Sequence, residues 1–185
     1  NVPPCPIDSI IIREPILLEI LNQNISTPSC AGLADASIDL TITGGNSTIN
    51  DGYNFAWNNG LPNTATPQNL TAGTYKVTIT DTKSCNISET IIIDPTPALT
   101  LDLNHTPPKC FGEANGEIIS MVTGGTSPYT YKWNDGLSQT TPIAYGLVAG
   151  GYTLTVTDAN DCEINQLEAV MNPPILSTAG ATIGS

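Results

Sequence analysis

One order of residues occurs twice in this chain, about 80 residues apart, and this internal repeat limits what the chain can fold into. Each copy runs from a Cys-x-Gly motif through Thr-Gly-Gly, an aromatic-x-aromatic-x-Trp motif and Leu-x-Ala-Gly-x-Tyr to a second cysteine. The first copy extends from Cys30 to Cys85, and the second extends from Cys110 to Cys162. Because two long stretches share one order of motifs, we expect two copies of one small domain rather than a single large domain.

Proline-rich junctions mark where the copies join. The spacing from Cys5 to Pro15 repeats the spacing from Cys85 to Pro95, so we expect Cys5 to belong to a copy that is mostly absent, which explains the odd number of five cysteines. The short, stiff joints favour a head-to-tail arrangement as a rod. The expected divisions are the last strand of a preceding repeat at residues 1–14, repeat 1 at 15–95, repeat 2 at 96–173, and the start of a following repeat or a linker at 174–185.

Each copy is predicted to be all-β, because apolar residues alternate with threonine and other polar residues and helical periodicity is absent. Asn59–Gly60, Asp135–Gly136 and the two Gly-Gly pairs are turn signals that accept a positive φ. The strands are expected near residues 16–22, 36–43, 53–57, 66–70, 74–81 and 87–93 in the first copy, and near 98–104, 116–123, 129–133, 143–147, 151–158 and 164–170 in the second.

Short strands at this spacing favour tandem immunoglobulin-like β-sandwiches. Trp57 and Trp133 lie on the third expected strand, where such folds bury a tryptophan. Tyr75 and Tyr152 begin the strands expected near 74–81 and 151–158, after Leu-x-Ala-Gly. This is the position of a tyrosine corner, at the sixth strand of the seven-strand fold. We therefore expect these four aromatic residues to form structural core, and the alternative is a platform of exposed rings that binds a ligand.

The motifs between Cys110 and Cys162 resemble the SprB repeats, which occur in large surface adhesins of gliding and other Bacteroidota. They are Cys-x-Gly, Thr-Gly-Gly-x-x-Pro-Tyr-x-Tyr-x-Trp, Leu-x-Ala-Gly-x-Tyr and Val-Thr-Asp-Ala-Asn-x-Cys. The first copy departs from the family pattern over residues 46–52, and Asp161 stands where the family usually has glycine. The resemblance implies a secreted, multi-repeat filament at the cell surface that serves cell adhesion or gliding motility, is exported by type IX secretion and has no catalytic role.

The charge of the chain excludes some classes of partner. Five Lys and Arg residues against 17 Asp and Glu residues give a formal net charge of −12, so the basic footprint that nucleic acid requires is missing. No apolar run approaches the roughly 18 residues that span a bilayer, so we expect no membrane insertion. The expected partners are neighbouring repeats of the same chain and extracellular surfaces or polysaccharide, and the expected location is extracellular, at the cell surface.

The cysteines recur at equivalent loop positions, which favours disulfides in an oxidising compartment over free buried thiols. The nearest pairing in sequence is within a copy, Cys30 with Cys85 and Cys110 with Cys162. In an up-and-down succession of seven strands, however, the loop after the first strand, which holds Cys30, and the loop after the sixth, which holds Cys85, lie at opposite ends of a domain. A strand of about seven residues separates them by roughly 23 Å. A disulfide needs Cα atoms within roughly 7 Å, so we favour the inter-domain pair Cys30–Cys162 and keep the intra-domain pairs as the alternative.

Side chains that carry chemistry are few, and we predict no catalytic, cofactor-binding or metal-binding residues. His105 is the one histidine, and no cysteine or carboxylate cluster accompanies it in the sequence. Calcium is the one ion that we consider, because acidic residues end strands or lie at the joints: Asp81, Asp158, Asp94 and Glu14. Asp8-Ser9-Ile10 resembles the O-glycosylation signal described for Bacteroidota, which makes Ser9 a candidate modification site.

Two functions from different classes follow from these observations. The first is a structural stalk segment of a filamentous surface adhesin, favoured by the near-identical architecture of two successive copies. The second is a binding module whose loops grip a glycan or a surface, favoured by the extra residues at 46–52 in the first copy. We expect the first function and no enzymatic activity.

Overall fold

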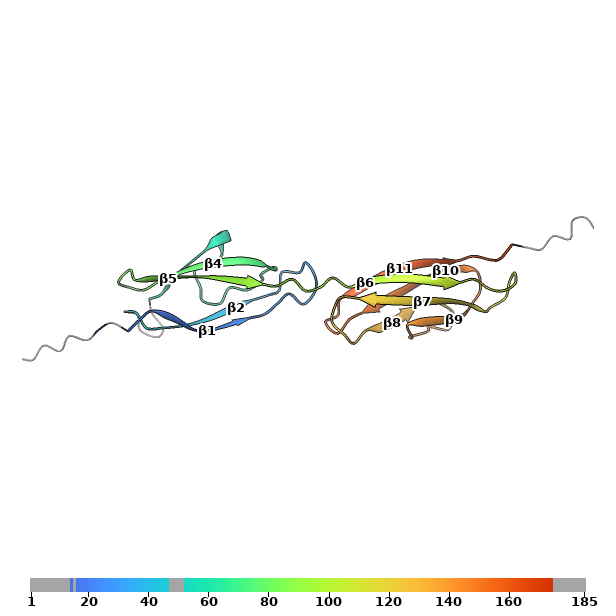
Figure 1. Ribbon diagram of the computed structural model, residues 1–185, viewed down its shortest axis with the longest axis horizontal. Helices are drawn as coiled ribbons and strands as arrows, with labels where there is room; N and C mark the ends of the chain where they lie inside the picture. Colours follow the sequence, from blue (N-terminus) through green and yellow to red (C-terminus); the bar gives the residue numbers. More distant parts are fainter. Residues whose placement is uncertain (1–13, 15, 47–51, 175–185) are drawn as a thin grey trace, which may run out of the picture. The chain divides into compact units, whose positions relative to one another are not determined.

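Regular alternation of buried and exposed residues gives the chain a nearly all-β structure. The computed structural model describes residues 14, 16–46 and 52–174, and β-strands occur throughout these ranges (Figure 1). The first five strands are β1 (Glu19–Ile25), β2 (Ile38–Thr43), β3 (Asn54–Trp57), β4 (Gly73–Thr80) and β5 (Asn86–Ile93). The remaining strands are β6 (Thr100–Thr106), β7 (Gly116–Thr123), β8 (Thr130–Trp133), β9 (Ile143–Leu147), β10 (Gly150–Thr157) and β11 (Glu163–Val170).

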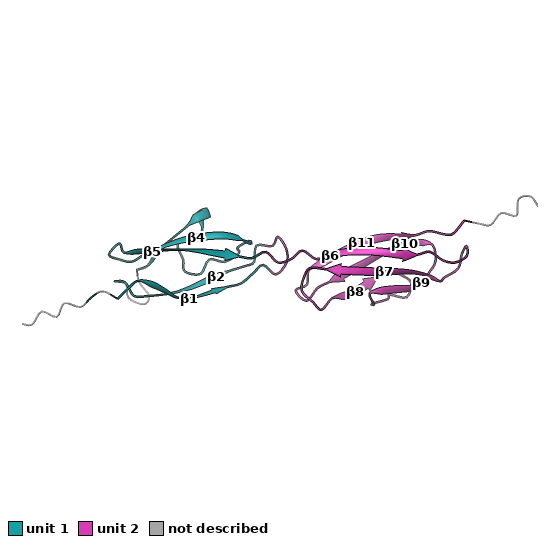
Figure 2. Cartoon of the chain, in the orientation of Figure 1, with its two compact units in different colours: residues 1–28, 34–94 teal, residues 29–33, 95–185 magenta. Residues whose placement is uncertain are grey.

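The chain divides into two units (Figure 2). Unit 1 comprises residues 1–28 and 34–94, and unit 2 comprises residues 29–33 and 95–185. The loop of residues 29–33 is placed between β1 and β2 in the sequence but is grouped with unit 2. The division therefore differs from the expected repeats at this short loop.

Unit 2 is a sandwich of two antiparallel three-stranded sheets. One sheet has the order β6-β7-β9, and the other has the order β11-β10-β8. The first, second and fourth strands thus share one layer, while the third, fifth and sixth share the other, which is the partition of strands in an immunoglobulin-like fold.

Unit 1 has the same arrangement with one strand fewer, in the sheets β1-β2 and β3-β4-β5 (Figure 1). Both units are therefore immunoglobulin-like β-sandwiches, which confirms the fold class expected from the sequence.

Each sandwich buries the inward face of its strands. Val77 and Ile79 on β4 are fully buried, and Leu154 and Val156 occupy the matching places on β10. Alternate residues of a strand point to one face, so the intervening threonines face outward. Burying an aliphatic side chain of this size contributes roughly 1.5–3 kcal/mol relative to leaving it exposed. The two cores are thus built by the repeated Val/Leu-x-Ile/Val pattern.

The expected strand at residues 66–70 is wrong. This segment runs beside β2 without forming a strand, and among the described residues its ladder-type pairing is limited to the bridge between Ala36 and Leu70. The Ile38 N–H donates to the Pro67 carbonyl at 3.1 Å, but Pro67 has no N–H to return a bond. A proline in the middle of the segment therefore leaves an irregular edge where the sequence pattern suggested a strand.

The first strand of each copy begins later than expected. The predicted ranges were 16–22 and 98–104, whereas β1 and β6 begin at Glu19 and Thr100. The residues just before them lie against the Gly-Gly turn, where the Gly45 N–H donates to the Ile16 carbonyl at 2.7 Å. This contact holds the apolar start of the segment beside the turn, before ladder pairing begins.

One turn signal also works differently from the expectation. Asn59 and Gly60 have positive φ values of 62° and 69°, whereas Gly136 does not adopt a positive φ. In that turn the Asp135 carboxylate accepts a hydrogen bond from the backbone N–H of Gln139 at 2.9 Å. A side-chain bond therefore closes the turn, and the positive φ falls on Ser138 at 51°.

Candidate functional site

A buried aspartate organises the turn between β10 and β11. Asp158 is 5% exposed, and its Oδ1 accepts hydrogen bonds from the backbone N–H groups of Asn160 at 2.8 Å and Cys162 at 3.0 Å. Its Oδ2 accepts a third bond, from the Thr126 N–H at 2.8 Å, which ties the turn to the Gly-Gly loop. Three bonds to one carboxylate fix the backbone on which Cys162 sits.

A disulfide joins this turn to the loop of residues 29–33, within unit 2. Cys30 and Cys162 are cross-linked with their Cα atoms 5.8 Å apart, inside the usual range for such a bond. The Asn160 side-chain amide also donates to the Ser29 carbonyl at 3.1 Å. The structure therefore brings together the two cysteines that the sequence favoured as a pair.

The same aspartate turn occurs in unit 1, where it ends in a free cysteine. Asp81 Oδ1 accepts from the N–H groups of Lys83 at 2.8 Å and Cys85 at 2.9 Å, and Oδ2 accepts from the Asn46 N–H at 2.8 Å. Cys85 is an exposed free thiol, as is Cys110 in unit 2. The alternative pairs within a copy are therefore not formed among the described cysteines, and Cys5 lies outside the described residues.

Burial and hydrogen bonding act in opposite directions on both aspartates. Burial raises the pKa of Asp81, but hydrogen bonds from Asn46 and from the turn backbone outweigh it and lower the pKa from 3.8 to about 2. Burial likewise raises the pKa of Asp158, and the three backbone N–H groups that it accepts from lower that pKa below 3.8 on balance. Both carboxylates are therefore held ionised in the folded protein.

Acid should destabilise the fold through these two groups. Their folded pKa values lie below the unfolded values, so their contribution is present above about pH 4 and is lost as the pH falls towards 2. We expect the melting temperature to fall steeply over that interval. The variant Asp158→Asn should have a lower melting temperature at pH 7, because an amide cannot accept all three hydrogen bonds. Its melting temperature should also fall less than that of the wild type as the pH is lowered.

Thermal unfolding followed by circular dichroism between pH 7 and pH 2 measures this effect. Asp102→Asn is the matched control. Asp102 is an exposed residue of β6, and its carboxylate accepts none of the hydrogen bonds described above. Equal acid sensitivity of the wild type and of Asp158→Asn would show that this carboxylate does not carry the effect.

The predicted aromatic residues lie in the two cores. Trp57 and Trp133 are 9% and 2% exposed, and their indole N–H groups donate to backbone carbonyls at 2.9 Å in each case. The Tyr75 hydroxyl donates to the carbonyl four residues earlier at 2.8 Å, and the half-buried Tyr152 does the same at 3.0 Å. These are tyrosine-corner bonds, and they support the structural role of the four rings over the alternative of an exposed ligand-binding platform.

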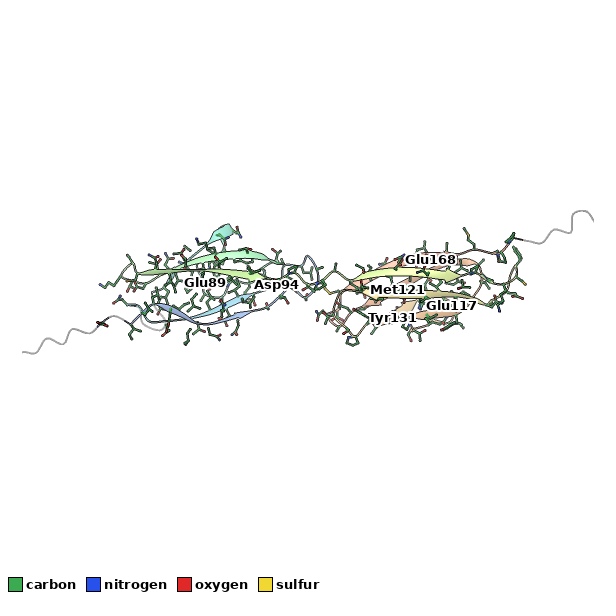
Figure 3. The ribbon with its side chains drawn as sticks, in the orientation of Figure 1. Glu89, Asp94, Glu117, Met121, Tyr131 and Glu168 are labelled. Atoms are coloured by element: carbon green, nitrogen blue, oxygen red, sulfur yellow. A yellow bond between two sulfur atoms is a disulfide. The ribbon has the colours of Figure 1, made fainter. Side chains whose placement is uncertain are left out.

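The remaining predicted positions do not form a chemical centre in the described part of the chain. His105 on β6 hydrogen-bonds through Nδ1 to the Glu168 carboxylate on β11 and so links the two layers of unit 2. Figure 3 labels Glu168 on unit 2. No three His, Cys, Asp or Glu side chains among the described residues gather closely enough to hold a metal ion. Calcium binding stays a prediction, and Ser9 lies outside the described residues.

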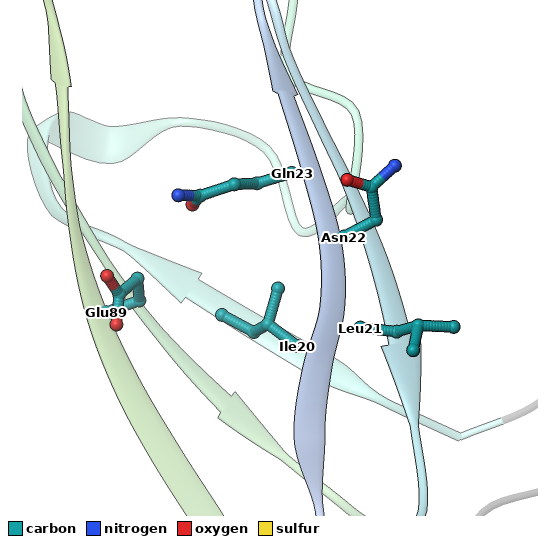
Figure 4. A pocket seen from close by; sticks show the side chains of 5 residues that line it. All are labelled: Ile20, Leu21, Asn22, Gln23 and Glu89. Atoms are coloured by element: carbon teal, nitrogen blue, oxygen red, sulfur yellow. The ribbon is translucent and has the colours of Figure 1, made fainter.

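An open hollow of about 360 Å³ lies along β1 and β5 of unit 1. Figure 4 shows Ile20 and Gln23 pointing towards β5, from which Glu89 projects, while Leu21 and Asn22 point away. The ladder between β1 and β2 shifts register between Ile20 and Asn22, which explains why neighbours leave the strand in this way. The lining offers one carboxylate and two amides, which can hydrogen-bond but do not form a nucleophile with a base.

Sequence reasoning missed the role of the acidic turns. Asp81 and Asp158 were considered as calcium ligands, whereas their oxygens accept hydrogen bonds from backbone N–H groups. The repeated Asp-x-x-x-Cys spacing was the available signal, because an aspartate that accepts from residues two and four positions later builds a turn. A second signal was the glycine that precedes each loop residue whose N–H the aspartate binds, Gly45 before Asn46 and Gly125 before Thr126. A Cβ on Gly125 would lie 2.7 Å from Asp158 Oδ2.

The fold and the aspartate turn that recurs in both units define a tandem immunoglobulin-like repeat protein. The family model of the SprB repeat matches residues 22–62 and 103–138, once in each copy. The chain therefore matches the SprB repeat at two places, which confirms the resemblance found in the sequence. SprB repeats are found in cell-surface proteins, and the match supports a surface-associated, adhesin-like module.

The chain is also similar to a curated protein, the "Decoration protein" of Escherichia phage T5, with 37% identity over 75 residues. That alignment covers 35% of this chain and 46% of the relative, so the chain spans about half the length of the curated relative that it matches.

The chain is similar to two solved structures. One is a 282-residue C-terminal fragment of intimin in complex with the intimin-binding domain of its translocated receptor, and the other is Bacteroides ovatus SGBP-B in complex with a mixed-linkage heptasaccharide. The intimin fragment is 15% identical, with 83% of this chain and 64% of that chain covered and a TM-score of 0.41. SGBP-B is 13% identical, with 84% of this chain and 71% of that chain covered and a TM-score of 0.23.

Within the described residues, no helix is long and apolar enough to cross a membrane.

Proposed function

We propose that this chain is a structural stalk segment of a large filamentous adhesin at the cell surface, and that it has no catalytic activity. The proposal includes export by type IX secretion and a role in surface attachment and gliding motility, which are the properties that the SprB resemblance implies. Its partners would be neighbouring repeats of the same chain and extracellular surfaces or polysaccharide. The net charge of −12 would keep such segments solvated and mutually repelling.

The observation that carries the stalk proposal is the covalent path through the Cys30–Cys162 disulfide. A force applied to the two ends of the chain passes from Cys30 directly to Cys162 across the sulfur–sulfur bond. All strands from β2 to β10 lie between these cysteines in the sequence, so the tension bypasses them. A segment built in this way could transmit shear along an adhesin while both sandwiches stay folded.

Single-molecule force spectroscopy on the oxidised and reduced chain tests the proposal. The two cysteines are 132 positions apart, and an extended chain spans at most about 3.3–3.6 Å per residue. We therefore expect full extension to gain about 440–475 Å of contour length after reduction, and none of this length to be released in the oxidised chain. The double variant Cys30→Ser/Cys162→Ser should behave like the reduced wild type.

Two results would count against the stalk. The first is release of the whole contour length from the oxidised chain under load, because the tension would then not bypass the strands. The second is specific binding of this chain on a glycan array, which would favour a binding module in place of a spacer. The variant Cys85→Ser is the matched control for cysteine replacement, because Cys85 is free and should not alter the extension.

A further inference from the structure

Each unit carries one free cysteine whose position in the repeat corresponds to one of the two cysteines in the Cys30–Cys162 disulfide. Cys85 ends the aspartate turn of unit 1 as Cys162 ends that of unit 2, and Cys110 begins a Cys-x-Gly loop as Cys30 does. Both Cys85 and Cys110 are exposed free thiols. A cysteine of each type is therefore available at the surface, and the formed pair shows that these two types fit each other.

The backbone that presents each free thiol matches its cross-linked counterpart. The Asp81 N–H donates to the Cys85 carbonyl at 2.9 Å, against 3.0 Å for Asp158 and Cys162. The Glu113 N–H donates to the Cys110 carbonyl at 3.2 Å, against 3.1 Å in the loop of Cys30. Both free cysteines are thus already held in the conformation of the bonded ones, and no refolding of either loop is needed.

The surface beside Cys85 supplies an independent observation. A hollow of about 210 Å³ on unit 1 is lined by Ile16, Leu17, Leu18, Gly45, Asn46, Cys85, Asn86 and Ile87. The matching hollow on unit 2 is lined by Ala98, Leu99, Asp161, Cys162 and Glu163, and there Cys30, Ala31 and Leu33 complete its wall. The hollow on unit 1 is lined by no such Cys-x-Gly loop among the described residues.

The two hollows correspond because the chain makes the same contacts at both. A Cβ on Gly44 would strike the Leu17 carbonyl, and a Cβ on Gly124 would strike the Ala98 carbonyl in the same way. Leu17 therefore stands where Ala98 stands, and it is 76% exposed, with Ile16 beside it 72% exposed. Unit 1 thus exposes a larger apolar surface at this place than unit 2 does, where the exposed Ala98 lines one hollow together with the cysteine loop.

The loop of Cys110 has the side chain that such a surface would accept. Phe111 follows Cys110 as Ala31 follows Cys30, and Phe111 is 60% exposed. A phenyl ring laid on Ile16 and Leu17 would remove apolar surface from water on both sides of the contact. Phe111 and Leu17 are thus both larger than the alanines at the corresponding positions of the formed link, Ala31 and Ala98.

We propose that residues 109–113 of one copy of this chain dock in the Cys85 hollow of a second copy and form a Cys110–Cys85 disulfide. The oxidant is a small-molecule disulfide: its sulfur–sulfur bond breaks, the two protein thiols lose their protons and two electrons, and two small thiols are released. Because every copy carries both halves, successive copies would join unit 2 to unit 1. The inference goes beyond the stalk proposal, since it concerns association between separate chains.

The test uses the chain with Cys5→Ser, so that Cys85 and Cys110 are the two free thiols. After incubation with oxidised glutathione, we expect a ladder of dimers, trimers and longer species on non-reducing gels that collapses on reduction. The tryptic peptides 84–109 and 110–132 should be found linked in the isolated dimer. A Cys85–Cys110 link in the monomer, or no ladder, would overturn the proposal.

Complementary variants test the direction of the link. Cys85→Ser and Cys110→Ser should each remain monomeric alone, and their mixture should stop at dimers. Phe111→Asp should slow dimer formation at least tenfold, whereas Leu137→Asp, which changes an equally apolar residue that is 73% exposed on the same unit, should not. Equal formation of Cys110–Cys110 dimers from Cys85→Ser alone, or no effect of Phe111→Asp, would contradict specific docking. The force measurement on the monomer is independent of this outcome.

Discussion

Replacing Trp133 with alanine is expected to lower the free energy of unfolding of unit 2 by about 3–5 kcal/mol. The indole is 2% exposed in the core of unit 2, so its removal leaves a cavity that neighbouring residues fill only in part. The change also leaves the Thr141 carbonyl without its 2.9 Å hydrogen bond from Nε1. Trp133→Phe should cost less, because it keeps an aromatic ring in the site.

Chemical denaturation measures this loss, and the two tryptophans separate the units. In Trp133→Ala the only remaining indole is Trp57, which reports unit 1, while circular dichroism reports the whole chain. We expect an added early transition by circular dichroism and an unchanged transition by fluorescence. Leu137→Ala is the control, because its exposed side chain should change the free energy by less than about 0.5 kcal/mol. An early fluorescence transition would instead mean that the loss spreads to unit 1.

Replacing Gly124 with alanine should have the second large effect. Gly124 has φ +71°, a region that costs an L-residue about 1–2 kcal/mol. Its new Cβ would also lie 1.9 Å from the Ala98 carbonyl oxygen, so the backbone before β6 would have to move. We therefore expect a loss well above the cost of the backbone conformation alone.

Gly112→Ala separates the two causes. Gly112 has φ +80° in the same unit, but a Cβ there meets no atom within 4 Å. This variant should lose only the conformational cost, so the difference between the two variants measures the steric contact at Ala98. Equal losses in thermal unfolding would show that the close approach of the Gly-Gly turn does not stabilise the sandwich.

The strands that could be predicted from the sequence are those whose own residues carry the pattern. The expected range 74–81 lies one residue from β4, and the expected range 116–123 coincides with β7. In both strands, alternation of apolar and polar residues ends at a turn signal, and the repeat supplies each pattern twice. Neither of these two strand predictions needs knowledge of a distant part of the chain.

Other features depend on contacts that a local pattern does not encode. Pro67 lies in a segment of suitable composition, and only the missing return bond to Ile38 shows that no strand forms. The favoured cysteine pair followed from the order of strands, but the grouping of residues 29–33 with unit 2 did not. The aspartate turns could be predicted only in part. The sequence singled out Asp81 and Asp158, but it did not indicate the backbone N–H groups from which they accept hydrogen bonds.

Peptide mapping under non-reducing conditions tests the central claim, the Cys30–Cys162 cross-link that bypasses strands β2 to β10. Arg13, Lys76, Lys83, Lys109 and Lys132 place each cysteine in a different tryptic peptide. After alkylation of free thiols in the monomeric chain, we predict that peptide 14–76 is linked to peptide 133–185, and that Cys85 and Cys110 are alkylated. A link between peptide 14–76 and peptide 84–109, which would join Cys30 to Cys85, would contradict the account.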